Sequence, residues 1–366
     1  MDSLPLPPGL EELASAPSLA PRGLIATGRA IGLAALGVAV AGTSALAWGS
    51  IERRFPVLRH FDLLVPAHRG IQDLKILHIA DLHMYPGQEF LVDFLRNVAA
   101  SEQVDMVIST GDNLSSVDGL ELAIAAHEPF FDLPGAFVLG SNDYYSPRPK
   151  SWSRYLSQDS RDNDRPTTPD LPWKELVQRF RDAGWADLSN RSALLDVPVR
   201  GPVTVDVAGP GGLEPGGAAS PLPSASLASS TLPLESIQPV ALMGVDDPHL
   251  DRDVMPETPA EWEKDSSLRI GVAHAPYQRV VNAFSDAGAD LVLAGHTHGG
   301  QLGIPFMAPL VTNCDLPRSH GKGMHPWTTV NSRTMLHVSA GLGTSKYVPF
   351  RVATRPEASI IHIRQM

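Results

Sequence analysis

Cysteine is almost absent from this sequence. The 366-residue chain has one, Cys314, so no internal disulfide can form. An excess of positive charge is also missing, because 29 lysines and arginines stand against 40 aspartates and glutamates, for a net charge of −11. Nucleic-acid-binding domains usually need a basic face, and the chain has no basic run. The sequence therefore argues against a nucleic-acid partner and against a nuclease.

The rest of the composition is typical of a globular protein, with 43% hydrophobic and 19% charged residues. Its length suits one large domain or two ordinary ones. Residues 1–22 differ from the rest of the chain, because they are rich in Pro, Ala and Ser. We interpret them as a disordered tail.

An uncharged run, "IGLAALGVAVAGTSALAWGSI", occupies residues 31–51. A helix needs about 20 apolar residues to cross a bilayer core. We therefore predict a transmembrane helix or signal anchor over residues 23–54, and hence a single-pass membrane protein. Two alternatives stay open: a cleaved signal peptide, since Ala45–Ala47 has the small-x-small form, and a buried Ala-rich helix. Arginines lie on both sides of the run, so the positive-inside rule does not choose the side of the membrane.

After a linker at residues 55–72, we predict one domain over residues 73–366. Short apolar runs recur in it, each too short for a helix and each with Gly, Asp or His at or near its end: "LKILHIAD", "DMVISTGD", "AFVLGSND", "RIGVAHAP" and "DLVLAGHTH". Segments of helical period lie between several of them, namely "EFLVDFLRNVAA", "PWKELVQRF" and "YQRVVNAF". Alternating strands and helices predict an α/β fold, in which ligands gather beyond the carboxyl ends of the strands.

Residues 209–239 break this pattern. They consist largely of Gly, Pro, Ser and Ala and cannot bury enough apolar surface to offset the cost of ordering. We predict a flexible insertion between two strands, "VTVDVAG" and "VALMGVDD". A tolerated surface insertion is the favoured interpretation, and a functional lid is the alternative.

Polar side chains follow the predicted strands at their ends. The set is Asp81, His83, Asp112, Asn142, Asp143, His274, His296 and His298. Their donor atoms are carboxylate oxygen, amide oxygen and imidazole nitrogen, a mixture that suits Mn, Fe or Zn. Without Asp143, seven candidate ligands are too many for one tetrahedral ion and suit two divalent metal ions that share a carboxylate. Two such ions can clamp a phosphate and lower the pKa of a bound water, which then attacks phosphorus as hydroxide.

Two pairs in this set, Asp81 with His83 and His296 with His298, are separated by one residue. Both members of such a pair point to one side only if the backbone keeps the period of two of a strand. Glycines beside the ligands let the backbone turn tightly and approach closely.

The motifs that contain these residues resemble those of the calcineurin-like metallophosphoesterases. They are Asp81-Leu82-His83, Gly111-Asp112, Gly140-Ser141-Asn142-Asp143, His274 and Gly295-His296-Thr297-His298. The resemblance covers about residues 73–365, and "HVSAGLGTS" and "GHTHGGQL" are similar to the bacterial membrane-associated branch. It implies a four-layer α/β/β/α sandwich of two mixed sheets.

The resemblance also implies how the ligands divide between two ions. One ion would be held by Asp81, His83, Asp112 and His298. The other would be held by Asp112, the loop Asn, His274 and His296, with Asp112 bridging the two.

The loop that begins at Gly140 departs from the family pattern, which is Gly-Asn-His-Asp or Gly-Asn-His-Glu. Ser141 stands where the family has the metal-binding Asn, and Asn142 stands where it has a His that assists the phosphate or the leaving group. We expect Asn142 to swing in as the amide ligand, because an amide oxygen is a better ligand than a neutral hydroxyl. In the alternative, Ser141 or a water binds the metal and Asn142 donates to the phosphate. We assign Asn142 and Asp143 as the catalytic residues of this loop.

General acid assistance contributes about 10²–10⁴-fold, so the loss of the loop His predicts a slower enzyme that favours leaving groups needing little protonation. His320 or His325, in "SHGKGMHP", is a candidate replacement from another loop. We predict a metal-dependent phosphoester hydrolase acting on a phosphomonoester, phosphodiester or pyrophosphate, with a membrane-associated or lipid-linked substrate suggested by the apolar run. The alternative is a non-catalytic metal-binding or scaffold protein. The sequence does not indicate the oligomeric state.

Overall fold

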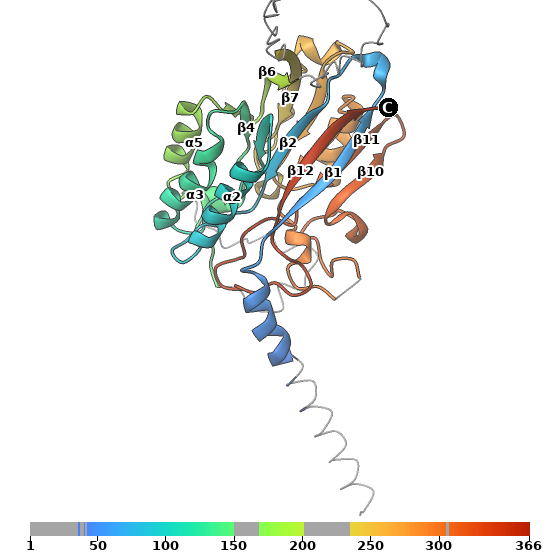
Figure 1. Cartoon of the computed structure of the whole chain (residues 1–366). Coiled ribbons are helices and arrows are strands. Elements are labelled where there is room, and N and C mark those ends of the chain that lie inside the picture. Colours follow the sequence, from blue (N-terminus) through green and yellow to red (C-terminus); the bar gives the residue numbers. More distant parts are fainter. Residues whose placement is uncertain (1–35, 37–39, 41, 150–167, 201–234, 305–306) are drawn as a thin grey trace, which may run out of the picture. The chain divides into compact units, whose positions relative to one another are not determined.

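The computed structural model describes residues 36, 40, 42–149, 168–200, 235–304 and 307–366 (Figure 1). The chain divides into two compact units, Met1–Trp48 and Gly49–Met366. In the first unit, residues 42–48 are helical. The predicted disordered tail, most of the predicted membrane segment and the centre of the predicted insertion lie outside the described residues. Among those that are described, no helix has the length and apolar character needed to cross a bilayer.

The second unit contains two six-stranded sheets. The first has the order β1 (Val57–Val65), β12 (Glu357–Gln365), β2 (Leu74–Ile79), β3 (Met106–Ser109), β4 (Gly135–Phe137) and β5 (Ala186–Asp187). The second has the order β10 (Gly323–Thr328), β11 (Arg333–Val338), β9 (Leu291–Ala294), β8 (Leu268–Val272), β7 (Glu235–Gly244) and β6 (Arg191–Arg200). Each sheet combines parallel and antiparallel pairs, so the prediction of two mixed sheets is confirmed.

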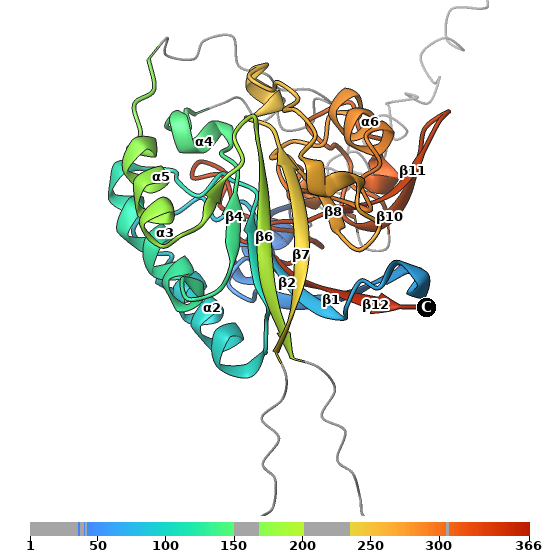
Figure 2. The same cartoon turned by 90° about the horizontal axis from the view of Figure 1, so that it is seen from above.

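Helices cover the outer faces of the two sheets. Helices α2 (Glu89–Ser101), α3 (Leu120–His127) and α5 (Trp173–Asp182) lie on the side of the first sheet, and α6 (Gln278–Asp286) lies on the side of the second (Figure 2). A single turn, α4 (Ser141–Tyr144), follows β4. The short 3-10 turns are η2 (Ala67–Arg69), η3 (Val117–Gly119), η4 (Glu128–Phe130), η6 (Pro248–Leu250), η7 (Ala260–Glu263), η8 (His298–Gly300) and η9 (Arg318–His320).

Three apolar clusters hold these layers together, because strand side chains alternate between the two faces of a sheet. On β2, Leu77 and Ile79 pack toward the helices, whereas Ile76 packs between the two sheets. On β9, Leu293 faces the same inter-sheet layer, and Val292 packs with α6. All five side chains are fully buried. Strands buried on both faces read as uninterrupted apolar runs, which is why they were visible in the sequence.

One predicted boundary differs from the structure. Residues 55–72, expected as a linker, contain β1, which pairs in parallel with β12 along nine residue pairs. The strand lies at the edge of its sheet and carries exposed polar residues such as Arg59 and His60. Charged residues are a common way to protect an edge strand from further pairing, and here they hid the strand from sequence analysis.

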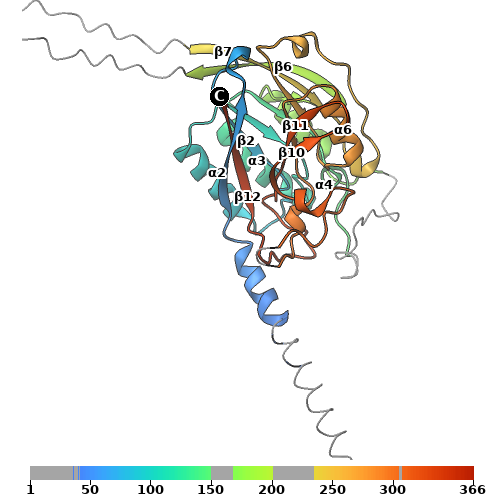
Figure 3. The ribbon, with the colours of Figure 1, turned by 90° about the vertical axis from the view of Figure 1, so that its right-hand side faces the viewer.

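The strands also determine which end of the molecule carries the polar loops. Strands β2, β3, β8 and β9 all lead directly into loops with candidate ligands. Strands β6 and β7 have the paired ends Arg200 and Glu235 at the opposite end of the sheet (Figure 3). Because β7 begins at Glu235, residues 235–239 of the predicted insertion belong to a strand instead. The predicted strand "VTVDVAG" lies outside the described residues.

Candidate metal centre

Backbone hydrogen bonds join the loops that follow the central strands. Asp81 N–H donates to Gly111 O (3.0 Å), and His83 N–H donates to Asp112 O (2.9 Å). In the second sheet, Gly295 N–H donates to His274 O (2.9 Å). Motifs that are far apart in the chain therefore meet at the carboxyl ends of neighbouring strands, as expected for a site in an α/β fold.

One group of candidate ligands consists of Asp81, His83 and His298, whose donor atoms lie within 4.8 Å of one another. The Nε2 atoms of His83 and His298 are 3.0 Å apart. On the other side of its ring, His83 Nδ1 lies 3.2 Å from Ser115 Oγ. A hydrogen-bond partner on the far nitrogen orients an imidazole ligand and fixes its tautomer.

A second group consists of Asp81, Asp112 and His274, again with donor atoms within 4.8 Å. His274 Nδ1 donates to Thr110 O (2.8 Å), which leaves Nε2 free to face the site. That Nε2 lies 3.2 Å from Nδ1 of His296, so His296 adjoins this group.

The carboxylate of Asp112 spans both groups. Its Oδ2 lies 3.4 Å from His83 Nε2, and its Oδ1 lies 3.4 Å from His274 Nε2. One oxygen therefore faces each group of ligands. This is the arrangement that a carboxylate shared by two ions requires.

The backbone at these ligands is left-handed, not strand-like. The φ angles are 52° at Asp81, 48° at His83, 54° at Asp112, 70° at His296 and 51° at His298. The expected period of two is therefore not what brings the paired side chains together. Positive φ is uncommon outside glycine, costs of the order of 1–3 kcal/mol per residue and clusters at functional sites.

Glycines beside the ligands permit close approach. A Cβ on Gly140 would lie 2.3 Å from Asp112 Oδ1 and 2.7 Å from the ring of His274. A Cβ on Gly295 would lie 2.6 Å from Asp81 Oδ2. All three distances are far below van der Waals contact, so the ligand arrangement depends on the absence of a side chain at these two positions.

The altered loop places Asn142 against the shared carboxylate. The backbone N–H of Asn142 donates to Asp112 Oδ1, and its side-chain Nδ2 donates to Asp112 Oδ2, both at 2.7 Å. Ser141 is buried, and its Oγ lies 3.5 Å from Asn142 Nδ2. The side-chain amide of Asn142 therefore lies beside the carboxylate of Asp112, which faces both ligand groups.

Asp143 makes a different kind of contact. Its carboxylate accepts hydrogen bonds from the backbone N–H groups of Gly140 (2.9 Å), Asp112 (2.9 Å) and Asn113 (2.8 Å). Asp143 thus ties the loop after β4 to the loop after β3. It is fully buried.

Burial and close charges shift the pKa values of the acidic residues. Burial, with a contribution from the charge of Asp112, raises the pKa of Asp81 to about 7 against the opposing charge of His274. Burial also raises the pKa of Asp143 to about 7, again with the charge of Asp112 acting in the same direction. Burial works to raise the pKa of Asp112 as well, but His274, His83 and the hydrogen bond from Asn142 outweigh it and hold that pKa well below its usual range.

The pKa values of the histidines shift in opposite directions as well. Burial lowers the pKa of His83 to about 4, and it lowers the pKa of His298 well below its ordinary value, with His83 adding to the effect. For His274, burial is outweighed by the charge of Asp112 and the hydrogen bond to it, which raise its pKa well above the ordinary value. His274 and Asp112 therefore favour each other's charged forms.

His249 is a member of this environment that sequence analysis missed. Its ring centroid lies 4.5 Å from that of His296, and its Nδ1 lies 3.0 Å from the hydroxyl of Tyr277. Asp247 begins the turn that positions it, because Oδ1 of Asp247 accepts from His249 N–H (2.8 Å). The signal in the sequence was a His two residues after Asp247, in "GVDDPHL".

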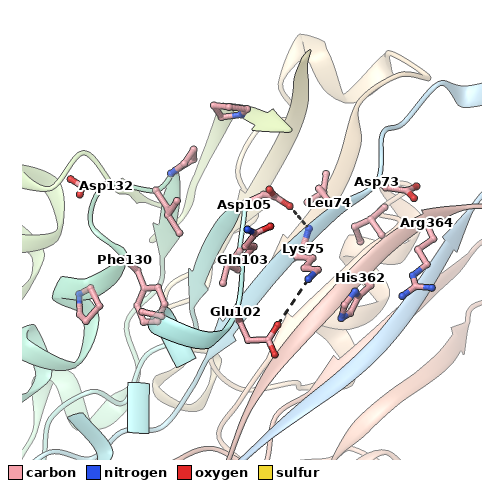
Figure 4. Close-up of a pocket in the computed structure, with 17 residues that line it drawn as sticks. Asp73, Leu74, Lys75, Glu102, Gln103, Asp105, Phe130, Asp132, His362 and Arg364 are labelled. Carbon is pink, nitrogen blue, oxygen red and sulfur yellow. Dashed lines mark hydrogen bonds and ion pairs between the residues drawn. The ribbon is translucent and has the colours of Figure 1, made fainter. Parts of the chain in front are cut away.

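A groove of about 640 Å³ lies elsewhere, around the amino-terminal ends of β2 and β3 (Figure 4). None of the candidate ligands lines it. Its lysine and acids interact with one another: Lys75 Nζ lies 4.0 Å from Glu102, and Lys75 N–H donates to Asp105 (2.7 Å). The groove is therefore separate from the ligand cluster.

The donor set fits divalent cations of the Mn, Fe or Zn type. It offers only oxygen and nitrogen atoms, and the single cysteine is not among them. Asp81 belongs to both ligand groups, and the carboxylate of Asp112 lies between His83 and His274, so the arrangement has room for two divalent cations side by side.

Comparisons with known proteins identify the class. The profile described as "Calcineurin-like phosphoesterase" matches residues 74–300, more than half of the chain. The chain therefore belongs to the calcineurin-like phosphoesterase family.

Individual relatives match over shorter stretches. "Uncharacterized protein YpbG" from Bacillus subtilis (strain 168) is 33% identical over 123 residues, which are 33% of this chain and 41% of the relative. "Uncharacterized metallophosphoesterase YkuE" from the same organism is 31% identical over 80 residues, or 22% and 26% of the two chains. Each match spans less than half of the relative. Among solved structures, TT1561 of Thermus thermophilus is similar with a TM-score of 0.36 and 13% identity, over 74% of this chain and 91% of that one.

Proposed function

We propose that the chain hydrolyses a phosphoester at a centre of two divalent metal ions. The observation that carries the proposal is the carboxylate of Asp112, which directs one oxygen to each group of ligands at 3.4 Å. Two bound ions would neutralise a phosphate and lower the pKa of the water that attacks phosphorus. Mn, Fe and Zn all suit the donors.

The proposed ligands combine the members of the two groups with their neighbours, and Asp81, which belongs to both groups, is assigned to the first ion. Asp81, His83, Asp112 and His298 would hold one ion. Asp112, Asn142, His274 and His296 would hold the other. For this, the amide of Asn142 must turn so that its oxygen replaces the nitrogen that now faces Asp112. Ser141 is the alternative ligand from the same loop.

We assign different roles to the other loop residues. Asp143 acts as a positioning residue, because its oxygens accept backbone N–H groups on both sides of the site. No imidazole occupies the position of Asn142, so the leaving group lacks a protonated His there. The rings of His320 and His325 contact each other in a tilted arrangement with centroids 4.8 Å apart, and neither residue belongs to a ligand group. We therefore expect the best substrates to be esters of acidic leaving groups, such as nitrophenol.

The uncharged run near the amino terminus supports two further proposals. Residues 23–54 would anchor the chain in a membrane, and the chain would belong to the bacterial membrane-associated branch of its family. The length of the run supports the anchor. The side of the membrane is not part of the proposal.

The test uses the full-length chain, stripped with chelator and reloaded with Mn²⁺, Fe²⁺ or Zn²⁺. We expect two metal equivalents per chain by elemental analysis and hydrolysis of p-nitrophenyl phosphate or bis-p-nitrophenyl phosphate. Two bound equivalents without turnover on either ester would support the alternative, a metal-binding scaffold that has lost the loop His. One equivalent or none would contradict the dimetal centre itself.

A further inference from the structure

Three segments meet beside the metal centre. Arg351 N–H donates to Gly49 O (3.0 Å), and Leu302 forms a parallel bridge with Val352. Glu52 accepts from Ala353 N–H (3.0 Å). The described residues of three segments, 49–55, 302–308 and 345–355, are therefore joined to one another. We call the described residues of these segments the rim.

The rim adjoins the proposed ligands directly. The guanidinium of Arg351 is fully buried, and its Nη2 lies 3.2 Å from Nδ1 of His298. On the other side, Arg53 Nη1 donates to the hydroxyl of Tyr85 (3.2 Å), two residues beyond His83. The rim therefore lies at the end of the sheets that carries the metal centre (Figure 1).

The exposed side chains of the rim are apolar or basic. The apolar ones are Ile51, Phe55, Ile304, Met307, Ala308 and Tyr347, and the basic ones are Arg54, Lys346 and Arg355. Met307 is 61% exposed and Phe55 is 56% exposed. The one acidic residue among the described rim residues, Glu52, is buried. In a chain with a net charge of −11, a surface without exposed acids stands out.

Apolar side chains interspersed with Lys and Arg are what a surface needs to insert into the headgroup region of an anionic bilayer. The chain itself indicates the same occupant, because its uncharged run of residues 31–51 ends inside the rim, at Ile51. We propose that the rim lies against an anionic lipid bilayer and that the substrate is a phosphoester of an amphiphile held in that bilayer. The substrate part rests on the proposed function, whereas the docking of the rim does not.

Single-cysteine labelling tests the docking independently of catalysis. Cys314 is buried and unique, so a Cys314→Ser background carries no other thiol. A fluorophore is attached at Tyr347→Cys on the rim or at Val330→Cys. Val330 is fully exposed in the turn between β10 and β11, at the end of the sheet remote from the metal centre. The full-length chains are reconstituted with vesicles of phosphatidylcholine and phosphatidylglycerol that contain headgroup-labelled quencher lipids.

We expect strong quenching at Tyr347→Cys and none at Val330→Cys, with weaker quenching in vesicles of phosphatidylcholine alone. Equal quenching at the two positions, or equal quenching in both kinds of vesicle, would overturn the proposal. The double variant Arg54→Glu, Lys346→Glu should lower hydrolysis of a vesicle-borne phosphoester at least about tenfold and leave hydrolysis of p-nitrophenyl phosphate unchanged. If both substrates are inert in the wild type while quenching follows the expected pattern, the proposed function fails and the docking stands.

Discussion

Replacement of Asp112 by Asn tests the shared carboxylate most directly. Asp112 is 2% exposed, and its oxygens accept two hydrogen bonds from Asn142 at 2.7 Å and lie 3.4 Å from two imidazoles. An Asn at this position has one acceptor oxygen where the carboxylate has two. Its NH₂ group must face either a donor of Asn142 or the protonated His274.

In the metal-free protein, the structure indicates how much stability the Asp112→Asn substitution should remove. Asp112 and His274 form a buried pair in which each stabilises the charge of the other. Removing one partner from such a pair costs about 3–5 kcal/mol, a large part of the 5–15 kcal/mol by which a typical protein is stable. The variant also loses the metal-linked stabilisation, which is about 2.7 kcal/mol per site when free metal is 100 times the dissociation constant.

The assay measures urea unfolding without metal, metal equivalents per chain, and turnover of bis-p-nitrophenyl phosphate. We expect Asp112→Asn to bind fewer than two ions and to lose at least about 10²–10³-fold in kcat, the size of effect seen when charge stabilisation is removed from a transition state. Asp290→Asn is the matched control. Asp290 is paired with Arg69 and Arg269 at the other end of the second sheet, so the control should lose stability but keep both ions and turnover. Two ions and near wild-type turnover in Asp112→Asn would refute a shared carboxylate.

Three further outcomes are expected from the structure. Gly140→Ala places a Cβ 2.3 Å from Asp112 Oδ1, so metal affinity should fall about 10–100-fold in a titration followed by calorimetry; an unchanged affinity would contradict the packing described. Metal affinity should rise with pH through about 7, because the proton of Asp81, whose pKa burial raises to about 7, must leave before an ion binds, as must the proton of His274, whose pKa is raised against burial by Asp112; a flat profile would argue against these ligands. Burial lowers the pKa of His127 to about 4 from its ordinary value of 6.5, so the stability that depends on its neutral form is complete above pH 6.5 and is lost as pH falls toward 4. His127→Phe should therefore reduce the acid-side slope of the unfolding free energy by about 1.4 kcal/mol per pH unit, measured by urea titration, and an unchanged slope would count against this account.

Much of the α/β core could be predicted because buried strands leave a direct trace in the sequence. The runs "LKILHIAD" and "DLVLAGHTH" became β2 and β9, each followed by the expected polar loop. Helix α2 also formed where a helical period was visible, and its Leu95 and Val98 are buried. Strand β1 was missed because an edge strand carries charged residues and therefore lacks a continuous apolar run.

The site could be predicted as a set of residues but not as a geometry. The spacing of Asp81 and His83 placed both residues at the end of one strand. Their left-handed backbone conformation, in contrast, depends on the loop and its hydrogen bonds and could not be predicted from spacing. Sequence analysis could not decide how Asn142 meets Asp112, because that contact depends on the turn α4. His249 was missed because a neighbour of a ligand carries no spacing signal of its own.

The hairpin of β6 and β7 has a practical use. Its paired ends, Arg200 and Glu235, lie across the sheet from the metal centre. A fluorescent reporter spliced into the sequence between these two strands would therefore sit far from the chemistry. Such a fusion would allow the protein to be located in living cells while the proposed activity is assayed in the same sample.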